Sequence, residues 1–235
     1  ACVAAMLCGA FNGVLVSKFN IQPMIATLIL FTAGRSIAAW INNNELPVIS
    51  EESFGIYGGF IPGIPIPTPV FIMLVCVLLT ALALKYTNLG LYTQAVGINA
   101  SSSRLNGLNP AFIKFISFVI LGLCVAVVGL IKVSRLSSIN YSVIAKDIEM
   151  DAILAVALGG NSLSGGKFNM TASILGAYVI QFLTTTLYKF NVESAALSAY
   201  KAVVVIALVV FSAPEVRKKL AGLTKKFKPQ AKEAV

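Results

Sequence analysis

Apolar runs of membrane length recur along the chain, and they constrain its fold more than any other feature. An α-helix needs about 20 apolar residues to cross the hydrocarbon core of a bilayer. Backbone polar groups must find partners inside the membrane, so such segments fold as helices. The sequence therefore predicts an all-α, polytopic transmembrane helix bundle. Its candidate spans lie near residues 2–17, 22–41, 67–84, 112–131, 171–188 and 196–213, with a shorter apolar run at 150–159.

The composition supports membrane insertion and disfavours a metal or cofactor site. Hydrophobic residues make up 57% of the chain and charged residues 11%, whereas charged residues approach a quarter of a soluble domain. The four cysteines lie in apolar runs without metal-ligand spacing, and there is no histidine, so we expect no metal and no cofactor. Because the sequence opens at Ala1 inside an apolar run, we expect further spans before it.

The charges of the connections predict how the chain is oriented. The connection 85–114 carries three basic residues and no acidic one, and the tail 214–235 carries seven basic and two acidic residues. The connection 42–66 carries three acidic and no basic residues. Cytoplasmic connections are enriched in Lys and Arg. We therefore expect residues 1–213 to form the transmembrane domain, 214–235 to form a basic cytoplasmic tail, and 42–66 to lie outside.

This orientation requires a short crossing. Residues 132–149 should lie outside and the Gly-rich segment 159–170 inside, so the chain between about 147 and 160 passes from one side to the other. That length is too short for a lipid-exposed span. We expect a short half-helix buried in the bundle, flanked by covered or hydrated backbone. Acidic side chains just before it, among them Asp151, complement its dipole; a contact at the outer mouth is the alternative.

Two short motifs favour structural interpretations. A phosphate-binding loop ending at Lys167 would need Gly where Asn161 stands, and Ser or Thr where Phe168 stands. The alternative is a flexible contact loop. The tripeptide at 109–111, Asn-Pro-Ala, occurs once, so we interpret Pro110 as the start of a helix rather than as half of a water-channel signature.

Polar residues within the apolar runs mark a candidate substrate path at Asn12, Thr27 and Arg35. A charge at the depth of Arg35 costs about 2.5–3.5 kcal/mol on insertion scales, so it should face the bundle or a hydrated cavity. The alternative for Arg35 is a structural bridge to a carbonyl or an outer carboxylate. The alternative for Asn12 is a hydrogen bond to a neighbouring helix. Residues 53–146 and 152–192 hold no Asp or Glu, which weakens proton-coupled transport.

Several stretches together resemble the membrane permease subunits of binding-protein-dependent ABC importers for monosaccharides, the ribose, xylose and galactoside group. They occur at residues 96–99, 104–109, 149–160 and 162–166, with Asn12-Gly13, Pro23, Ala26 to Leu28 and Arg35 also fitting. Residues 22–30 and 166–169 look closest to galactofuranose-type permeases. The family's Gly-Gly-Ile-Asp-Leu-Ser-type segment is absent, Met150 replaces a frequent Leu, and Asn161 replaces a frequent Thr.

The resemblance implies a subunit of the bacterial inner membrane that forms part of a sugar translocation path. Its implied partners are a cytoplasmic ABC ATPase, a second permease subunit and a periplasmic sugar-binding protein, and ATP hydrolysis would reside on the ATPase. The segments 86–112 and 159–170 are then candidates for coupling. The residues predicted to couple are Gly97, Asn99, Arg104, Gly159, Gly160, Ser162, Ser164, Gly165 and Gly166.

Two other classes of function stay open at this point. A passive channel or an ion-coupled secondary carrier for a small polar solute would need no ATPase. A membrane-embedded enzyme would need a nucleophile beside a base or paired carboxylates in the bilayer, and no base accompanies the Ser and Thr residues of the spans. The identity of the sugar, and whether the pairing permease is identical or related, do not follow from these residues.

Overall fold

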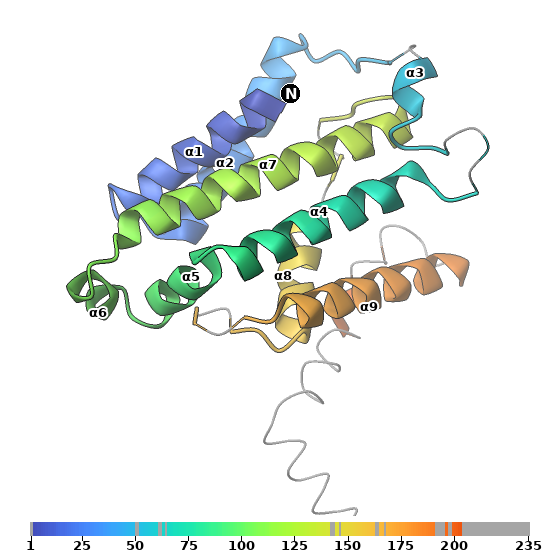
Figure 1. The fold of residues 1–235 in the computed structure, drawn as a ribbon. Helices are drawn as coiled ribbons and strands as arrows, with labels where there is room; N and C mark the ends of the chain where they lie inside the picture. The colour runs from blue at the N-terminus through green and yellow to red at the C-terminus, as the bar shows by residue number, and fades with distance from the viewer. Residues whose placement is uncertain are drawn as a thin grey trace, which may run out of the picture. The chain divides into compact units, whose positions relative to one another are not determined.

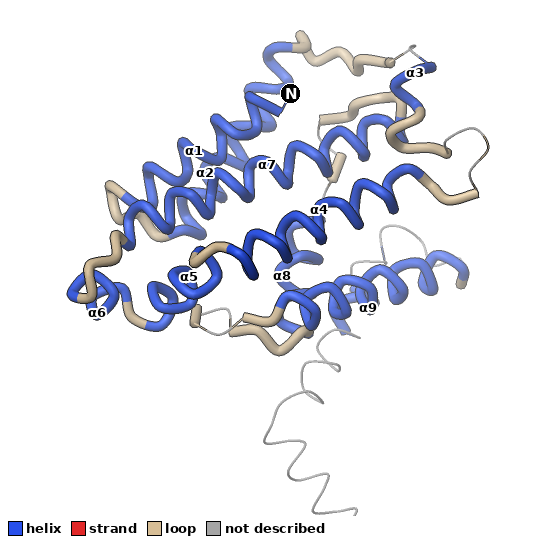
Figure 2. The backbone as a smooth tube through the Cα atoms, in the orientation of Figure 1, coloured by secondary structure: helices blue, strands red, loops and turns tan. Residues whose placement is uncertain are grey.

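The described part of the protein is all-α, as predicted. The structure is a computed structural model, and it describes residues 2–49, 52–60, 63, 65–141, 144–145, 147–162, 165–166, 168–190, 196 and 199–203. Within them the helices are α1 (Cys2–Ser17), α2 (Pro23–Ile41), α3 (Glu52–Gly55), α4 (Thr68–Tyr86), α5 (Leu89–Ile98), α6 (Ala100–Leu105), α7 (Pro110–Leu136), α8 (Ile148–Leu158) and α9 (Met170–Lys189) (Figures 1 and 2).

The helix bounds follow the predicted spans closely. In the described residues, α2, α4, α7 and α9 are long and apolar enough to cross a membrane, whereas α1 is a shorter apolar helix. The predicted half-helix is α8, with 11 residues. Most of the predicted span 196–213, Ser164 of the predicted coupling set and the whole tail 214–235 lie outside the described residues.

Proline and asparagine define where several helices begin. Pro23 and Pro110 occupy the first turns of α2 and α7, where a missing N–H costs nothing. The Asn109 side chain accepts a hydrogen bond from the Phe112 N–H at 3.2 Å, so it caps α7. The helix-start interpretation of the Asn-Pro-Ala tripeptide is therefore confirmed.

The first compact unit, residues 1–146, is built on the close antiparallel contact of α1 and α7. A Cβ added to Gly9 would lie 2.6 Å from the Phe118 carbonyl oxygen, and one added to Gly122 would lie 2.8 Å from the Ala5 carbonyl oxygen. Only glycine permits this backbone approach, which is the usual way that membrane helices pack. Gly129 on the same helix has open space around it, so the small-residue contact covers only part of α7.

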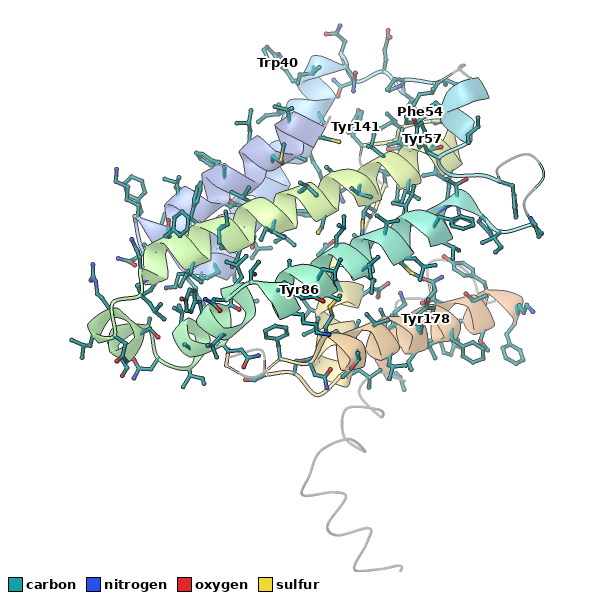
Figure 3. The ribbon with its side chains drawn as sticks, in the orientation of Figure 1. Trp40, Phe54, Tyr57, Tyr86, Tyr141 and Tyr178 are labelled. Atoms are coloured by element: carbon teal, nitrogen blue, oxygen red, sulfur yellow. The ribbon has the colours of Figure 1, made fainter. Side chains whose placement is uncertain are left out.

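The connections that the charge pattern assigns to the outside meet at one end of this unit. Val48 and Ser138 form an antiparallel bridge, and the Ser134 hydroxyl donates to the Phe54 carbonyl at 2.5 Å. The two segments predicted to lie outside, 42–66 and 132–149, thus meet at one end of the unit. Figure 3 shows Trp40 and Tyr141 at this end. Exposed aromatic residues such as Trp40 are typical of membrane interfaces.

The opposite end carries two helices that the sequence analysis did not predict. The connection 85–114, in which no helix was predicted, contains α5 and α6. Both are far shorter than a membrane span, so a search for span-length apolar runs passes over them. Asn99 separates them, and its side chain accepts the Ser102 N–H at 3.0 Å as the N-cap of α6.

The second compact unit starts at Asp147 and is centred on α8 and α9, which pack antiparallel. A Cβ on Gly176 would lie 2.1 Å from the Ala155 carbonyl oxygen, and a Cβ on Gly159 would lie 2.7 Å from the Ala172 carbonyl oxygen. Ala155 and Ile180 are buried in this contact. One face of α8 is thus tightly covered by α9, while Ile153 is 42% exposed.

Replacing Gly176 with Ala should destabilise the protein, because the new methyl group would meet the backbone of α8. We expect the free energy of unfolding to fall by about 1–3 kcal/mol, as for other overpacked cores. Gly129→Ala is the matched control, since it places the same methyl group on a helix in open space. Unfolding in mixed detergent micelles, followed by circular dichroism, measures both variants; equal stability of the two would contradict the close packing.

Candidate functional site

Side-chain hydrogen bonds of Asn161 close the loop between α8 and α9. Its Nδ2 donates to the Ser173 Oγ at 2.8 Å and to the Val156 carbonyl at 3.2 Å, and its Oδ1 accepts the Asn169 N–H at 2.5 Å. One amide therefore joins the end of α8 to the start of α9. The resemblance leads us to expect Thr at this position. Asn161 has more hydrogen-bonding groups than Thr.

The loop glycines predicted to couple have different structural roles. Gly160, Gly165 and Gly166 have φ values of +74°, +96° and +99°, a backbone conformation that favours glycine. Gly159 is instead needed for the close approach to α9. The Gly165 N–H donates to the Ser162 carbonyl at 3.3 Å, so the backbone of Ser162 forms part of the turn. Thus at least four of the predicted residues shape the loop itself.

The other predicted coupling residues lie around the junction of α5 and α6. Gly97 is in the last turn of α5, Asn99 caps α6, and Arg104 is in its last turn. Two apolar side chains are strongly exposed here, Leu105 at 90% and Ile98 at 69%. A short helix pair that exposes apolar side chains beside a cation has the character of a protein contact surface.

The three residues predicted to line a substrate path have different surroundings in the structure. Asn12 is 7% exposed, and its Oδ1 has no hydrogen-bond partner in the described part of the chain. The Thr27 hydroxyl donates to the Pro23 carbonyl of its own helix at 3.0 Å. Asn12 alone among the three therefore presents a buried polar atom that still requires a partner.

Arg35 makes the structural bridge that the sequence analysis kept as an alternative. Its Nη1 donates to the Tyr141 carbonyl oxygen at 3.1 Å, and its guanidinium lies 4.6 Å from the centroid of the Phe31 ring. Tyr141 in turn donates from its hydroxyl to the Asn44 side chain at 3.1 Å. The hydrogen bond of Arg35 therefore connects α2 to the segment after α7, at the end of the unit that is predicted to lie outside.

An ion pair that the sequence analysis missed connects α8 to the segment after α9. Lys201 Nζ donates to both carboxylate oxygens of Asp151, at 2.9 and 2.8 Å. The Lys201 side chain is 14% exposed and that of Asp151 is 30% exposed. The signal was a lysine inside the predicted span 196–213, a position where charge is costly unless it is paired. The dipole interpretation of Asp151 is therefore incomplete.

Comparisons with known proteins show which family the chain belongs to. Residues 1–213 match the family described as "Branched-chain amino acid transport system / permease component". The chain is 37% identical over 231 residues to the fructose import permease protein of Bifidobacterium longum, covering 95% of this chain and 64% of that protein. It is 35% identical over 206 residues to the galactofuranose transporter permease protein of Escherichia coli, covering 87% and 60%.

A third relative, the ribose import permease protein of Escherichia coli, is 37% identical over 204 residues, covering 86% of this chain and 63% of that protein. The chain thus spans somewhat less than two thirds of the length of these relatives. No solved structure matches it. With the family match over residues 1–213 and four apolar helices of spanning length in the described residues, the chain belongs to this family of permease components, multi-pass proteins of the bacterial inner membrane.

Proposed function

We propose that the chain is the transmembrane subunit of an ATP-driven, binding-protein-dependent sugar importer and forms part of its translocation path. Residues 1–213 would be the permease domain and 214–235 a basic cytoplasmic tail. The partners would be a cytoplasmic ABC ATPase, a second permease subunit and a periplasmic sugar-binding protein. ATP would be hydrolysed by the ATPase, so this subunit would need neither catalytic residues nor a cofactor. Support comes from relatives named for the import or transport of fructose, galactofuranose and ribose.

The observation that carries this proposal is the firm connection of the α8–α9 loop to a helix too short to span the bilayer. With 11 residues, α8 is about 16 Å long. Asn161 binds its end to α9, and Gly159 and Gly176 allow the two backbones to touch. A displacement of the loop by an ATPase would therefore move α8 as a rigid piece rather than being absorbed by flexible chain.

The first turn of α8, at the end away from the loop, contacts another segment that a displacement of α8 would move. Asp151 lies in its first turn and pairs with Lys201. Under the predicted orientation, the loop faces the cytoplasm and Asp151 lies toward the outside. Movement of α8 would then be passed to the segment that carries Lys201, near the outer mouth of the path. In this way ATP-driven contact at one side would bias access at the other.

The α5–α6 pair would supply a second contact for the ATPase. Ile98 and Leu105 would enter apolar sites on that partner. In the path itself, the amide oxygen of Asn12, which is buried in this conformation, would accept a hydrogen bond from a sugar hydroxyl once transport exposes it. Thr27 would contribute at most a second polar group, and Arg35 would position the outer connection rather than touch the sugar.

An ion-coupled carrier is the second candidate, because Asp151 and Lys201 form an ionisable pair within the predicted membrane region. The energy source separates the two. Sugar uptake into sealed membrane vesicles from cells that express the chain should require ATP and should survive a protonophore. Fructose, ribose and galactofuranose are the sugars to test first. Uptake driven by a proton gradient without ATP, or uptake by the purified chain alone in liposomes, would exclude the importer.

Substituting Gly165 and Gly166 together with Leu should lower sugar uptake at least tenfold while leaving the amount of inserted protein unchanged. Both positions have positive φ, which costs an L-residue roughly 1–2 kcal/mol, so the loop would change shape. Gly63→Leu is the matched control, because Gly63 also has a positive φ, +89°, but lies in the connection 42–66 and outside the predicted coupling set. Undiminished uptake by the double variant would argue against coupling through this loop.

A further inference from the structure

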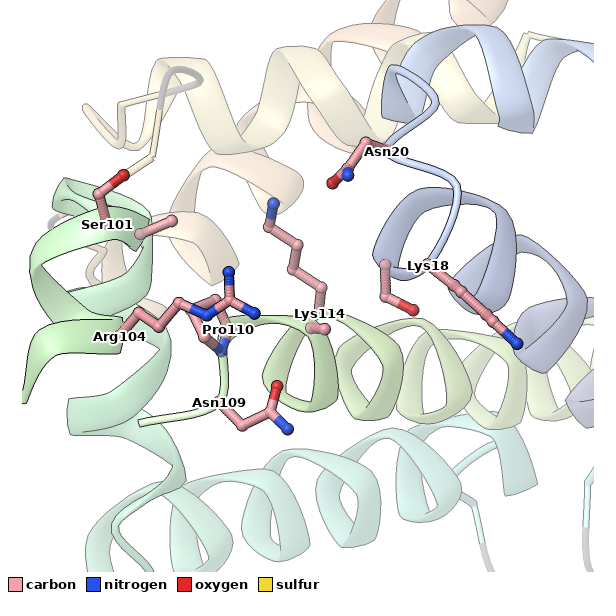
Figure 4. A pocket seen from close by; sticks show the side chains of 10 residues that line it. Lys18, Asn20, Ser101, Arg104, Asn109, Pro110 and Lys114 are labelled. Atoms are coloured by element: carbon pink, nitrogen blue, oxygen red, sulfur yellow. The ribbon is translucent and has the colours of Figure 1, made fainter. Parts of the chain in front are cut away.

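A basic pocket opens at the end of the first unit where α1 ends and α6 and α7 meet. Its volume is about 330 Å³, and its lining includes Lys18, Asn20, Ser101, Arg104, Asn109 and Lys114. In Figure 4, the side chains of Arg104 and Lys114 point into the same space, Asn20 lies across from them, and the ammonium of Lys18 points away. We propose that this pocket binds the phosphate headgroup of an anionic phospholipid.

The charge of the pocket is uncompensated within this part of the chain. Residues 1–44 and 53–146 contain no Asp or Glu, and the one ion pair found among the described residues joins Lys201 to Asp151 in the other unit. The cations come from separate elements, α6 for Arg104 and α7 for Lys114. Lys114 lies in the first turns of α7, and the positive end of that helix dipole adds to the attraction for an anion.

The surroundings of the pocket favour a lipid over a free anion or a protein carboxylate. Phe19 is 64% exposed and Phe112 is 59% exposed. In the sequence, Phe19 lies between the lining residues Lys18 and Asn20, and Phe112 follows the lining residue Ala111. Above the pocket, α1 and α7 continue as apolar helices with exposed side chains such as Val14 and Leu121. A headgroup held by Arg104 and Lys114 would leave its acyl chains along this apolar surface.

Lipid sites of this kind are a general feature of membrane proteins. Basic pockets between membrane helices on the cytoplasmic side attract anionic headgroups, and each nearby Lys or Arg strengthens attachment. The positive charge of this end predicts that it faces the cytoplasm. The inference goes beyond the proposed function and does not depend on which solute is carried or on how transport is powered.

Native mass spectrometry of the purified chain tests the proposal. Phosphatidylglycerol and phosphatidylcholine with identical acyl chains are added in turn, and the fraction of lipid-bound protein is compared. The chain should bind phosphatidylglycerol preferentially. Arg104→Gln with Lys114→Gln should reduce that binding more than tenfold, at about fivefold for each charge, whereas Lys114→Gln alone should reduce it about fivefold. Lys85→Gln with Lys132→Gln removes two charges outside the pocket and should leave binding unchanged.

Three outcomes would overturn the proposal. The first is equal binding of phosphatidylglycerol by the chain and by both pocket variants, with circular dichroism showing that all are folded. The second is displacement of the lipid by millimolar inorganic phosphate, which would indicate a site for a soluble anion. The third is loss of bound lipid when the chain is isolated with a cytoplasmic ATPase, which would assign the pocket to a protein contact.

Discussion

The contact between the backbones of α8 and α9 is the constraint on which the functional account depends. Gly176 and Gly159 leave no room for a side chain between the two helices, and Asn161 adds hydrogen bonds from the loop to both. In a bilayer, close approach of small residues replaces the hydrophobic effect as the source of helix association. A short helix held in this way can transmit motion, because Asn161 at its end is hydrogen-bonded to both helices.

The spans could be predicted because their cause is local. A largely apolar run such as Phe115 to Ile131 satisfies its backbone in lipid by folding as a helix, and Asn109 with Pro110 shows where that helix starts. The short helix α8 agrees with the short crossing predicted from the charges on either side of it. The sheet-like bridge of Val48 with Ser138 agrees with the same count, because it joins two segments that were both assigned to the outside.

Contacts made by single polar side chains could not be predicted, because they depend on which residues the fold brings together. Arg35 could bond a carbonyl or line a path, and only the position of Tyr141 decides between them. The Thr27 hydroxyl donates to a carbonyl of its own helix, an acceptor that was available whatever the tertiary fold. The ion pair of Lys201 was not predicted, because the span 196–213 was treated as wholly apolar. A lysine within a span requires a partner, and here that partner is Asp151. Of the three residues proposed for a polar path, Asn12 is the one with a buried, unpartnered oxygen in the described part of the chain.

Sided labelling tests the central claim that the α8–α9 loop faces the cytoplasm and joins a helix too short to span. Ser162→Cys and Asn44→Cys are introduced into a chain whose four native cysteines are replaced, and intact cells or inverted vesicles are treated with a membrane-impermeant maleimide. The account predicts that Cys at 162 reacts only in inverted vesicles and Cys at 44 only in intact cells. Reaction of both positions from the same side would contradict it.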